Sequence, residues 1–422
     1  MPEPRKTPLH SWHCDHHAQM AVFGGYSMPM WYASAKDEHL AVLTRAGLFD
    51  TCHMAVLTLQ GPDAYDLLQY CFTKDLKACC GPRQEALTEG RCVYGAFLDA
   101  QGHVIDDAIV FMLGGSEYMV VVNAGMGAPV AAHLGRHKGD RRLTITDWTD
   151  RLGKIDVQGP LSVRMLQSLL KDPDQVFSHL PYFAFKGDFR SDGGRTPVAF
   201  KNGTSALVSR TGYTGEIGFE LFCPLDQAGR LWETLLEAGR PSGVTACGLA
   251  ARDSLRAGAV LPLSHQDIGH WPFVRHPWPF ALPYAPDQRR FTKSFIGDQA
   301  LLNAQDAPYT LPFVGYDARK VAADSAAVKT RDGRTIGKVL TCTTDMAIGR
   351  HEGEVFSIAS PDRPSVWMPR GLCCGFVYVQ EPIAAGQRIA LHDSRRTVEV
   401  QIVADIRPAR TARRPLKHFM NP

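Results

Sequence analysis

Hydrophobic and polar positions follow two different patterns in the first part of the chain. The pattern over residues 36–46 predicts a helix that ends at Gly47. Residues 56–60 alternate between apolar and polar side chains, which predicts a strand. The Gly-Pro-Asp turn at 61–63 then opens a helical pattern that reaches Tyr70. Helices and strands therefore succeed one another closely here.

Three predicted strands follow, and only short turns separate them. Residues 93–98, 103–112 and 117–123 are rich in apolar and β-branched side chains. The turns at 99–102 and 114–116 contain glycine and are too short for a crossover helix. We expect these strands to form an antiparallel meander.

A strand that ends in Gln-Gly-Pro occurs twice. Residues 56–62 and 154–160 share this ending, and a helical pattern follows each copy. The second copy continues with predicted strands near 206–209 and 219–223 and with a helix near 226–238. The repetition favours two related α+β halves. The alternative is that the two Gln-Gly-Pro sequences are Gly-Pro turns that recur by chance.

The remainder of the chain predicts a smaller, all-β domain. Residues 264–294 are rich in Pro, His and aromatic side chains, which indicates an ordered connection. From about 310 to 410 the chain has short strands separated by glycine turns, as in a small β-barrel. We expect an α+β protein with domains at 1–150, 151–305 and 306–422, the first of which can include part of the later chain.

Composition narrows the class of protein. The 422 residues include 45% hydrophobic and 21% charged side chains, so a large core is expected. The net charge of +3 gives no indication of nucleic-acid binding. No apolar run reaches the ~18 residues of a membrane span, so we expect no membrane partner. Eleven scattered cysteines indicate reduced thiols and a cytoplasmic location.

Two local clusters of ionisable side chains have ordinary explanations. The histidine cluster between His10 and His17 lacks a second set of ligands, so we expect the start of a surface helix and no metal. The basic run from Arg407 to Lys417 is expected to be a solvated tail. Phosphate or polyglutamate binding is the alternative for this run.

Residues 210–221 are the strongest candidate for a ligand site. Three glycines fall within seven residues, and glycine lets a ligand approach the main chain closely. Tyr213 offers a ring face, while Glu216 and Glu220 offer acceptors. This combination suits a flat heterocycle with N–H donors better than a phosphate. A strand–turn–strand whose glycines serve only the turn explains the same residues.

Two adjacent aspartates in the second predicted strand are candidates for proton transfer. Asp106 is flanked by apolar residues, and loss of solvation there tends to raise the pKa of a carboxyl group. Asp107 points to the opposite face and is the better candidate for capping the turn at 101–102. The residues alone do not decide between them. Arg252 is followed by Asp253, and a structural ion pair is the simplest explanation for that arginine.

Several short motifs occur in a fixed order along the chain. They are Thr7-Pro8-Leu9, Phe23-Gly24-Gly25-Tyr26-Ser27-Met28-Pro29, Ala46-Gly47-Leu48-Phe49-Asp50 with His53-Met54, Val104-Ile105-Asp106-Asp107, Val121-Val122-Asn123-Ala124, the segment at 210–221, Cys247-Gly248-Leu249-Ala250-Ala251-Arg252-Asp253, and Phe295-Ile296-Gly297. With this set the chain resembles the T-protein family of the glycine cleavage system, the aminomethyltransferases. The resemblance implies two related α+β domains and a C-terminal β-barrel around a central folate site.

The resemblance also implies an activity. Tetrahydrofolate would accept a one-carbon unit from an aminomethylated lipoyl carrier protein, with release of ammonia and formation of 5,10-methylenetetrahydrofolate. Asp106 matches the catalytic aspartate of the family, while Glu220 and Arg252 match residues that hold the pterin end. The expected pocket wall consists of Met54, Tyr118 and Tyr213, with Val93, Tyr94 and Val120 as neighbours.

Two segments depart from the family pattern. After Arg256 the usual Leu-Glu-Ala-Gly and Tyr-Gly-Gln-Glu stretches are replaced by Ala-Gly-Ala-Val at 257–260 and Ser-His-Gln-Asp at 264–267. An insertion at 353–370 interrupts the barrel. Both departures can lie where the one-carbon donor enters, so the donor is less certain than the folate.

Two alternative functions therefore stay open. One is a tetrahydrofolate-dependent demethylase acting on a small methylated compound, where extra Trp and His side chains would bind an aromatic or cationic donor. The other is a non-catalytic folate-binding maintenance protein. Such relatives carry a cysteine in the segment matching 210–215, which this chain lacks, and this chain retains Asp106.

Overall fold

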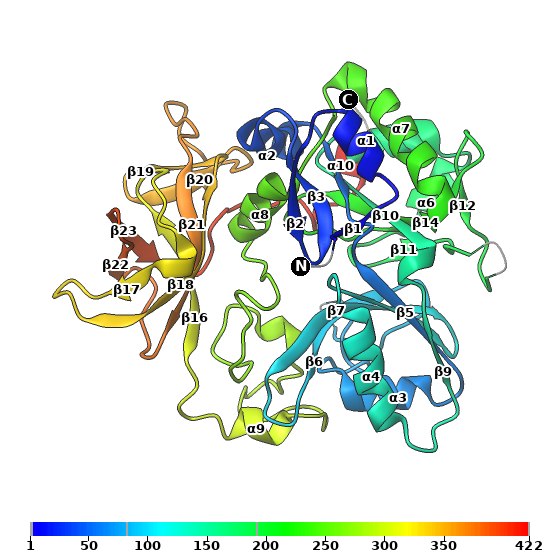
Figure 1. Ribbon diagram of the computed structural model, residues 1–422, viewed down its shortest axis with the longest axis horizontal. Coiled ribbons are helices and arrows are strands. Elements are labelled where there is room, and N and C mark those ends of the chain that lie inside the picture. Colours follow the sequence, from blue (N-terminus) through cyan, green and yellow to red (C-terminus); the bar gives the residue numbers. More distant parts are fainter. Residues whose placement is uncertain (1–2, 82, 191–192, 421–422) are drawn as a thin grey trace.

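A computed structural model describes residues 3–81, 83–190 and 193–420. Figure 1 shows three parts around a common centre: a sheet at the lower right, a second sheet at the upper right and a barrel at the left. Among the described residues no helix is long and apolar enough to cross a membrane.

The first sheet has the strand order β6-β7-β8-β5-β9. Its elements are β5 (Ala55–Gln60), β6 (Cys92–Leu98), β7 (Val104–Gly114), β8 (Glu117–Val122) and β9 (Thr144–Asp147), with helices α3 (Ala64–Cys71) and α4 (Gly127–Lys138) on one face. β6, β7 and β8 pair antiparallel in sequence order, which confirms the expected meander. Leu67 and Leu68 of α3 and Leu134 of α4 bury this face in a common core.

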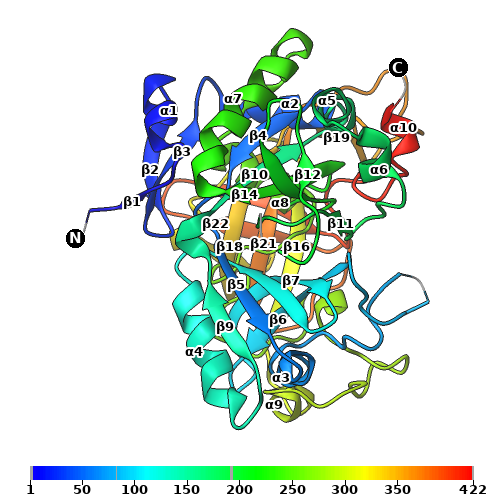
Figure 2. The ribbon, with the colours of Figure 1, turned by 90° about the vertical axis from the view of Figure 1, so that its right-hand side faces the viewer.

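The second sheet has the order β11-β13-β14-β10-β4-β15, and β12 pairs with β13. Its strands are β4 (Gly47–Asp50), β10 (Leu152–Gln158), β11 (Phe185–Lys186), β12 (Val198–Ala199), β13 (Ser205–Ser209), β14 (Gly218–Pro224) and β15 (Thr245–Ala246). The helices beside them are α5 (Ser162–Leu169), α6 (Pro173–Phe177) and α7 (Ala228–Gly239). Figure 2 shows the two sheets one above the other, and Phe111 of β7 meets Phe222 of β14 between them.

The start of the chain belongs with the second sheet rather than the first. β4 pairs antiparallel with β10, so residues before position 50 join a sheet whose other strands come from 152–246. The chain therefore does not divide simply at residue 150. Residues 1–2 and 421–422 of the expected outer domains lie outside the described residues.

The repeated Gln-Gly-Pro marks equivalent positions in the two sheets. β5 ends at Gln60 and β10 ends at Gln158, and each is followed within a few residues by a helix. Gly61 and Gly159 both have positive φ, of 144° and 124°. A Cβ on either glycine would lie 2.4 Å from a backbone oxygen. Glycine is thus required at both sites for the same reason.

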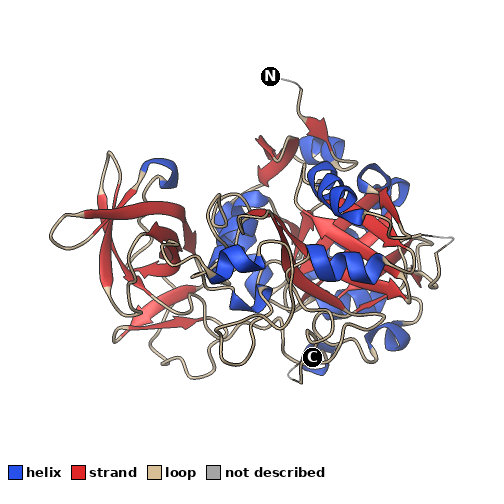
Figure 3. Ribbon diagram, turned by 90° about the horizontal axis from the view of Figure 1, so that it is seen from below, coloured by secondary structure: helices blue, strands red, loops and turns tan. Residues whose placement is uncertain are grey.

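The barrel closes in the order β16-β21-β18-β17-β22-β23. Its strands are β16 (Tyr309–Gly315), β17 (Ala327–Lys329), β18 (Thr335–Asp345), β21 (Leu372–Val379), β22 (Arg388–His392) and β23 (Thr397–Ile402). The expected insertion begins with β20 (Glu354–Ser357), which pairs with β19 (Ile348–His351) beside the barrel. Figure 3 shows that this part of the molecule is built mainly of strands.

Short elements connect the three parts. They are β1 (Arg5–Lys6), α1 (His10–Asp15), β2 (Gln19–Phe23), β3 (Tyr26–Trp31), α2 (Ala35–Thr44), α8 (Leu249–Gly258), α9 (Asp298–Leu302) and α10 (Lys417–Met420). The expected helix at 36–46 is α2, and the Ser34 side chain caps it by accepting the backbone N–H of Asp37. In α1, His13 is buried and its Nε2 lies 2.9 Å from Asp50 Oδ2, so this histidine serves the core.

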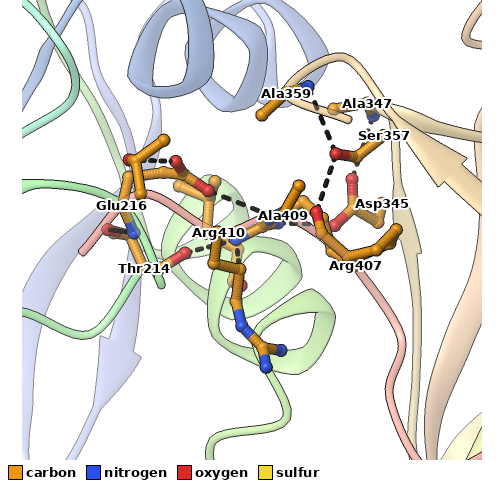
Figure 4. A network of polar contacts seen from close by, with 12 residues as sticks. Thr214, Glu216, Asp345, Ala347, Ser357, Ala359, Arg407, Ala409 and Arg410 are labelled. Atoms are coloured by element: carbon orange, nitrogen blue, oxygen red, sulfur yellow. Dashed lines mark hydrogen bonds and ion pairs between the residues drawn. The ribbon is translucent and has the colours of Figure 1, made fainter. Parts of the chain in front are cut away.

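The C-terminal basic run is only partly a solvated tail. Arg407 is 1% exposed and joins three segments of the chain. Its guanidinium lies 2.5 Å from Asp345 Oδ2 in the barrel and 3.3 Å from Glu216 Oε1, and it also donates to the carbonyl of Thr214 (Figure 4). The expectation of a fully solvated run is therefore wrong at this arginine, whose charge is needed to neutralise two buried carboxylates.

Candidate functional site

The three parts enclose a cavity of about 2660 Å³. Six of the residues expected at the ligand site line it: Met54, Val93, Tyr94, Tyr213, Glu220 and Arg252. They come from segments that are far apart in the sequence, and the fold brings them together. The volume exceeds the ~300–1,000 Å³ of an ordinary small-molecule pocket, so the cavity can hold one ligand and admit part of another.

Two expected wall residues lie elsewhere. Tyr118 and Val120 are 1% and 0% exposed and pack in the core beneath α3 and α4. Side chains alternate between the faces of a strand, and on β8 Val121, the residue after Val120, lines the cavity instead. The prediction for Val120 was therefore wrong by one residue of register, and Tyr118 belongs to the core rather than to the cavity wall.

Asp106 and Asp107 point to opposite faces of β7, as expected for neighbours in a strand. Asp107 lines the cavity. Asp106 is completely buried and faces the segment after α8. Neither aspartate caps the turn at 101–102, because Asp99 Oδ1 accepts the backbone N–H groups of Gln101 and His103, each at 2.9 Å.

Asn123 holds the two aspartates together. Its Nδ2 donates to Asp106 Oδ1 at 2.8 Å and to Asp107 Oδ1 at 2.6 Å, and its backbone N–H donates to Asp106 Oδ2 at 2.8 Å. Tyr94 donates its hydroxyl to Asp107 Oδ2 at 2.7 Å. We call Asp106 and Asp107 the carboxylate pair.

The surroundings of Asp107 favour the protonated form of its carboxyl group. Burial and the neighbouring charge of Asp106 raise the pKa of Asp107 to about 6, although hydrogen bonds from Tyr94 and Asn123 act in the opposite direction. Burial also raises the pKa of the Tyr94 hydroxyl, so this group remains a donor. A carboxyl group that titrates near neutrality suits acid–base work.

Glu220 belongs to a buried chain of alternating charges. Lys154 Nζ lies 2.6 Å from Glu220 Oε1 and 2.6 Å from Asp156 Oδ1, and Arg252 Nη1 donates to Asp156 Oδ2 at 2.7 Å. Burial alone would raise the pKa of Asp156, but the charges of Lys154 and Arg252 outweigh it and hold the pKa at about 2. Arg252 is thus paired with Asp156 rather than with Asp253.

Tyr213 stands beside this chain. The Arg252 guanidinium lies 5.0 Å from the centre of the Tyr213 ring, and the Tyr213 hydroxyl donates to the carbonyl of Pro262. Thr211 donates to the second carboxylate oxygen of Glu220. Each carboxylate oxygen of Glu220 has two lone pairs, so both can still accept an N–H group from a ligand.

The glycines and Glu216 of the 210–221 segment have structural roles. A Cβ on Gly212 would lie 2.1 Å from Gln158 Oε1, and one on Gly215 would lie 2.7 Å from Ala259. Glu216 accepts from Thr411 at 2.5 Å as well as pairing with Arg407. Close packing explains the glycines, and of the two glutamates only Glu220 lines the cavity.

The sequence interpretation missed several cavity residues. Lys154, Asn123, Val121 and His53 all line the cavity. Asn123 and His53 belong to two of the sequence motifs that carry the family resemblance. Their place in those motifs could have identified them as cavity residues. His53 is 2% exposed and its Nδ1 has no hydrogen-bond partner among the described residues. Burial lowers the pKa of His53 to about 4, so its ring is neutral and can bond a ligand.

Comparison with known proteins identifies the family. The family model described as the GCVT N-terminal domain matches residues 9–271. The chain belongs to the GCVT family. An aminomethyltransferase of Bacillus subtilis is 31% identical over 363 residues, which cover 83% of this chain and 90% of that relative. An aminomethyltransferase of a Geobacillus species is 37% identical over 265 residues, covering 63% of this chain and 66% of the relative.

A solved GCVT structure shares the whole fold. The glycine cleavage system aminomethyltransferase T of Bartonella henselae has a TM-score of 0.75 at 24% identity, covering 97% of this chain and 99% of that one. The expected α+β fold with a C-terminal barrel is thereby confirmed. This GCVT protein therefore has the architecture of an enzyme family whose curated members are named aminomethyltransferases.

Proposed function

We propose that the protein is a cytoplasmic, tetrahydrofolate-dependent aminomethyltransferase. In this proposal a lipoyl carrier protein delivers the aminomethyl group, ammonia is released and 5,10-methylenetetrahydrofolate is formed. One observation carries the proposal: a single cavity collects Asp107 of the carboxylate pair, Tyr213 and the Glu220–Arg252 region. Membership of the GCVT family supports the same conclusion.

The cavity residues fit a folate. Glu220 has acceptor capacity for an aminopyrimidine edge, Tyr213 supplies a ring face, and the neutral His53 has an unpaired nitrogen among the described residues. Tetrahydrofolate, when bound, supplies the nitrogen atoms that take up the one-carbon unit. Lys154 and Arg252 hold the buried acidic groups in place without needing the ligand.

The carboxylate pair would manage the proton. Asp107 faces the cavity and Asp106 lies directly behind it, with Asn123 bonded to both. A carboxylate here can accept a proton from a reacting nitrogen, and it can stabilise positive charge that develops there. We keep Asp106 as the proposed catalytic aspartate, with Asp107 as its partner on the cavity side.

An assay of ammonia release tests the proposal. Tetrahydrofolate and aminomethylated carrier protein are supplied to the wild type, to Asp106→Asn and to Asp66→Asn, a control at an exposed position on α3. We expect release by the wild type and the control, and a loss of about 100-fold or more in Asp106→Asn with folate still bound. A wild type that binds folate but releases no ammonia would contradict the carrier-dependent reaction.

A demethylase acting on a small methylated compound is the second candidate. The observation that favours it is the contact of Ser264 and His265 with Asp106, in the segment that departs from the family pattern. The aromatic residues of that segment, which were expected to bind a methylated donor, give the demethylase less support. Trp278 is 1% exposed, donates to the carbonyl of Val260 and stacks near His276, so it packs in the core.

A further inference from the structure

His265 lies against the buried end of the carboxylate pair. Its Nε2 is 3.5 Å from Asp106 Oδ1, and its side chain is 51% exposed whereas that of Asp106 is 0% exposed. Asp107, the other member of the pair, faces the cavity. The pair therefore has the cavity on one side and a solvent-accessible imidazole on the other.

Continuous polar contacts join these groups. Asn123 Nδ2 donates to both aspartates, and Ser264 Oγ donates to Asp106 Oδ1 at 2.9 Å. The same Asp106 oxygen thus meets the amide of Asn123, the hydroxyl of Ser264 and the ring of His265. A carboxylate oxygen surrounded in this way can pass a proton with little movement of heavy atoms.

The backbone around His265 is held firmly. His265 has φ of 63°, a left-handed conformation that few residues other than glycine adopt. The next two residues anchor the segment to β18: Gln266 donates to the carbonyl of Leu340, and Asp267 accepts from Thr341 at 2.6 Å. The fold therefore maintains an unusual conformation that places an imidazole beside Asp106.

The electrostatic surroundings suit proton exchange. The hydrogen bond and charge of Asp106 raise the pKa of His265, against the effect of burial, and Asp107 adds to this rise. Tyr94 on β6 faces Asp107, and on the segment of His265 itself Asp267 is paired with Arg256. His265 therefore lies directly against the carboxylate pair, with its Nε2 facing Asp106 Oδ1.

We propose that His265 is a positioning residue that relays protons between the carboxylate pair and solvent. A proton taken up from the cavity by the pair passes from the Asp106 carboxyl to Nε2 of the neutral imidazole, and the resulting imidazolium releases the proton on Nδ1 to water. The carboxylate is thereby restored, and the imidazole, now protonated on Nε2, returns to its starting tautomer by exchanging protons with water. The relay rests on the proposed function, because it serves a reaction that exchanges protons in this cavity.

The contact itself is tested without turnover. In protein labelled with ¹⁵N-histidine, the signal that is lost in His265→Gln identifies His265, and its pKa is measured by NMR titration in the wild type and in Asp106→Asn. We expect the pKa of His265 to be lower in Asp106→Asn. An unchanged pKa would overturn the relay whether or not the enzyme transfers aminomethyl groups.

The relay is tested by kinetics. His265→Gln keeps a side-chain donor near Asp106 but cannot titrate, so we expect kcat to fall by about 10-fold or more while KM for folate is unchanged. The acid limb of the kcat–pH profile, where the imidazolium cannot accept a proton, should disappear. Imidazole added to His265→Ala should restore part of kcat.

A histidine on the same segment provides the control. The His270 ring lies 4.3 Å from that of His103 and takes no part in the relay, so His270→Gln should keep the wild-type kcat and pH profile. If His265→Gln also keeps both, the relay is wrong even though the transfer reaction stands. If the wild type is inactive with the carrier protein, the proposed function fails, and the NMR titration still decides the contact between His265 and Asp106.

Discussion

At the scale of single residues, Asp107 has the environment with the clearest consequence. Its carboxyl group lies half-buried beside Asp106, and desolvation together with the charge of Asp106 raises its pKa to about 6. In the unfolded chain the pKa of the same group is about 4. Between these two pH values the folded protein holds a proton on Asp107 that the unfolded chain has lost. The raised pKa therefore stabilises the folded state most fully below the unfolded pKa, and this stability is lost as pH rises through the folded pKa.

Asp107→Asn should remove this pH dependence. We expect the free energy of unfolding of the wild type, relative to the variant, to fall by about 1–3 kcal/mol as pH rises from about 4 to about 7. Urea unfolding at several pH values in this range measures the difference. Asp66→Asn, at an exposed position, should run parallel to the wild type throughout. A difference that grows in the opposite direction would show that Asp107 is ionised more readily than an ordinary carboxyl group.

At the scale of elements, strand β8 shows how far the sequence could predict the site. The run of apolar and β-branched residues over 117–123 correctly predicted a strand, and the short turn at 114–116 correctly predicted its antiparallel pairing with the preceding strand. Both faces of β8 are buried, however, so Val120 and Val121 look alike in sequence. Only the packing of α3 and α4 on one face determines which valine meets the cavity.

The two valines form a matched pair for experiment. Val120→Ala removes two methyl groups from a closed core, so we expect a loss of about 2 kcal/mol in unfolding free energy and unchanged folate affinity. Val121→Ala removes the same groups from the cavity wall and widens the cavity. It should therefore weaken folate binding a few-fold, with a smaller loss of unfolding free energy than Val120→Ala. Denaturant unfolding and calorimetric titration with tetrahydrofolate separate the two effects, and equal folate affinities for both variants would place the ligand away from β8.

The candidate site illustrates the same limit. The motifs brought Glu220 and Arg252 to attention, but their partners Lys154 and Asp156 lie in a strand whose sequence suggested only a repeat. Long-range pairing of β10 with β14 places Asp156 opposite Glu220. Contacts of this kind depend on which strands become neighbours, and local sequence patterns do not carry that information.

At the scale of the whole molecule, Arg407 connects the barrel to the rest of the protein. Its guanidinium is 1% exposed and meets Asp345 and Glu216, which belong to different parts of the structure. Removing one partner of a buried ionic cluster leaves the others without compensation. The cluster therefore fixes the barrel beside the cavity.

Arg407→Met should be strongly destabilising. We expect a loss of about 3–5 kcal/mol in unfolding free energy, because two buried carboxylates lose their counter-charge. Denaturant unfolding followed by circular dichroism measures the loss. Arg410 pairs with Asp405 at a partly exposed position, so Arg410→Met is the control and should cost no more than about 1 kcal/mol. Similar losses of unfolding free energy for the two variants would mean that the Arg407 cluster does not hold the barrel to the rest of the protein.

The path of the chain after Arg407 affects the order in which the protein can assemble. Thr411 Oγ1 accepts the backbone N–H of Ile217 at 2.9 Å, and the N–H of Ala412 donates to the carbonyl of Gly215 at 3.1 Å. These contacts join the loop at 215–217 to residues that are made much later in synthesis. Domains generally fold as they emerge during translation. This loop, however, meets its partners only after a further 194 residues have been synthesised, so the residues up to 217 cannot complete the binding site by themselves.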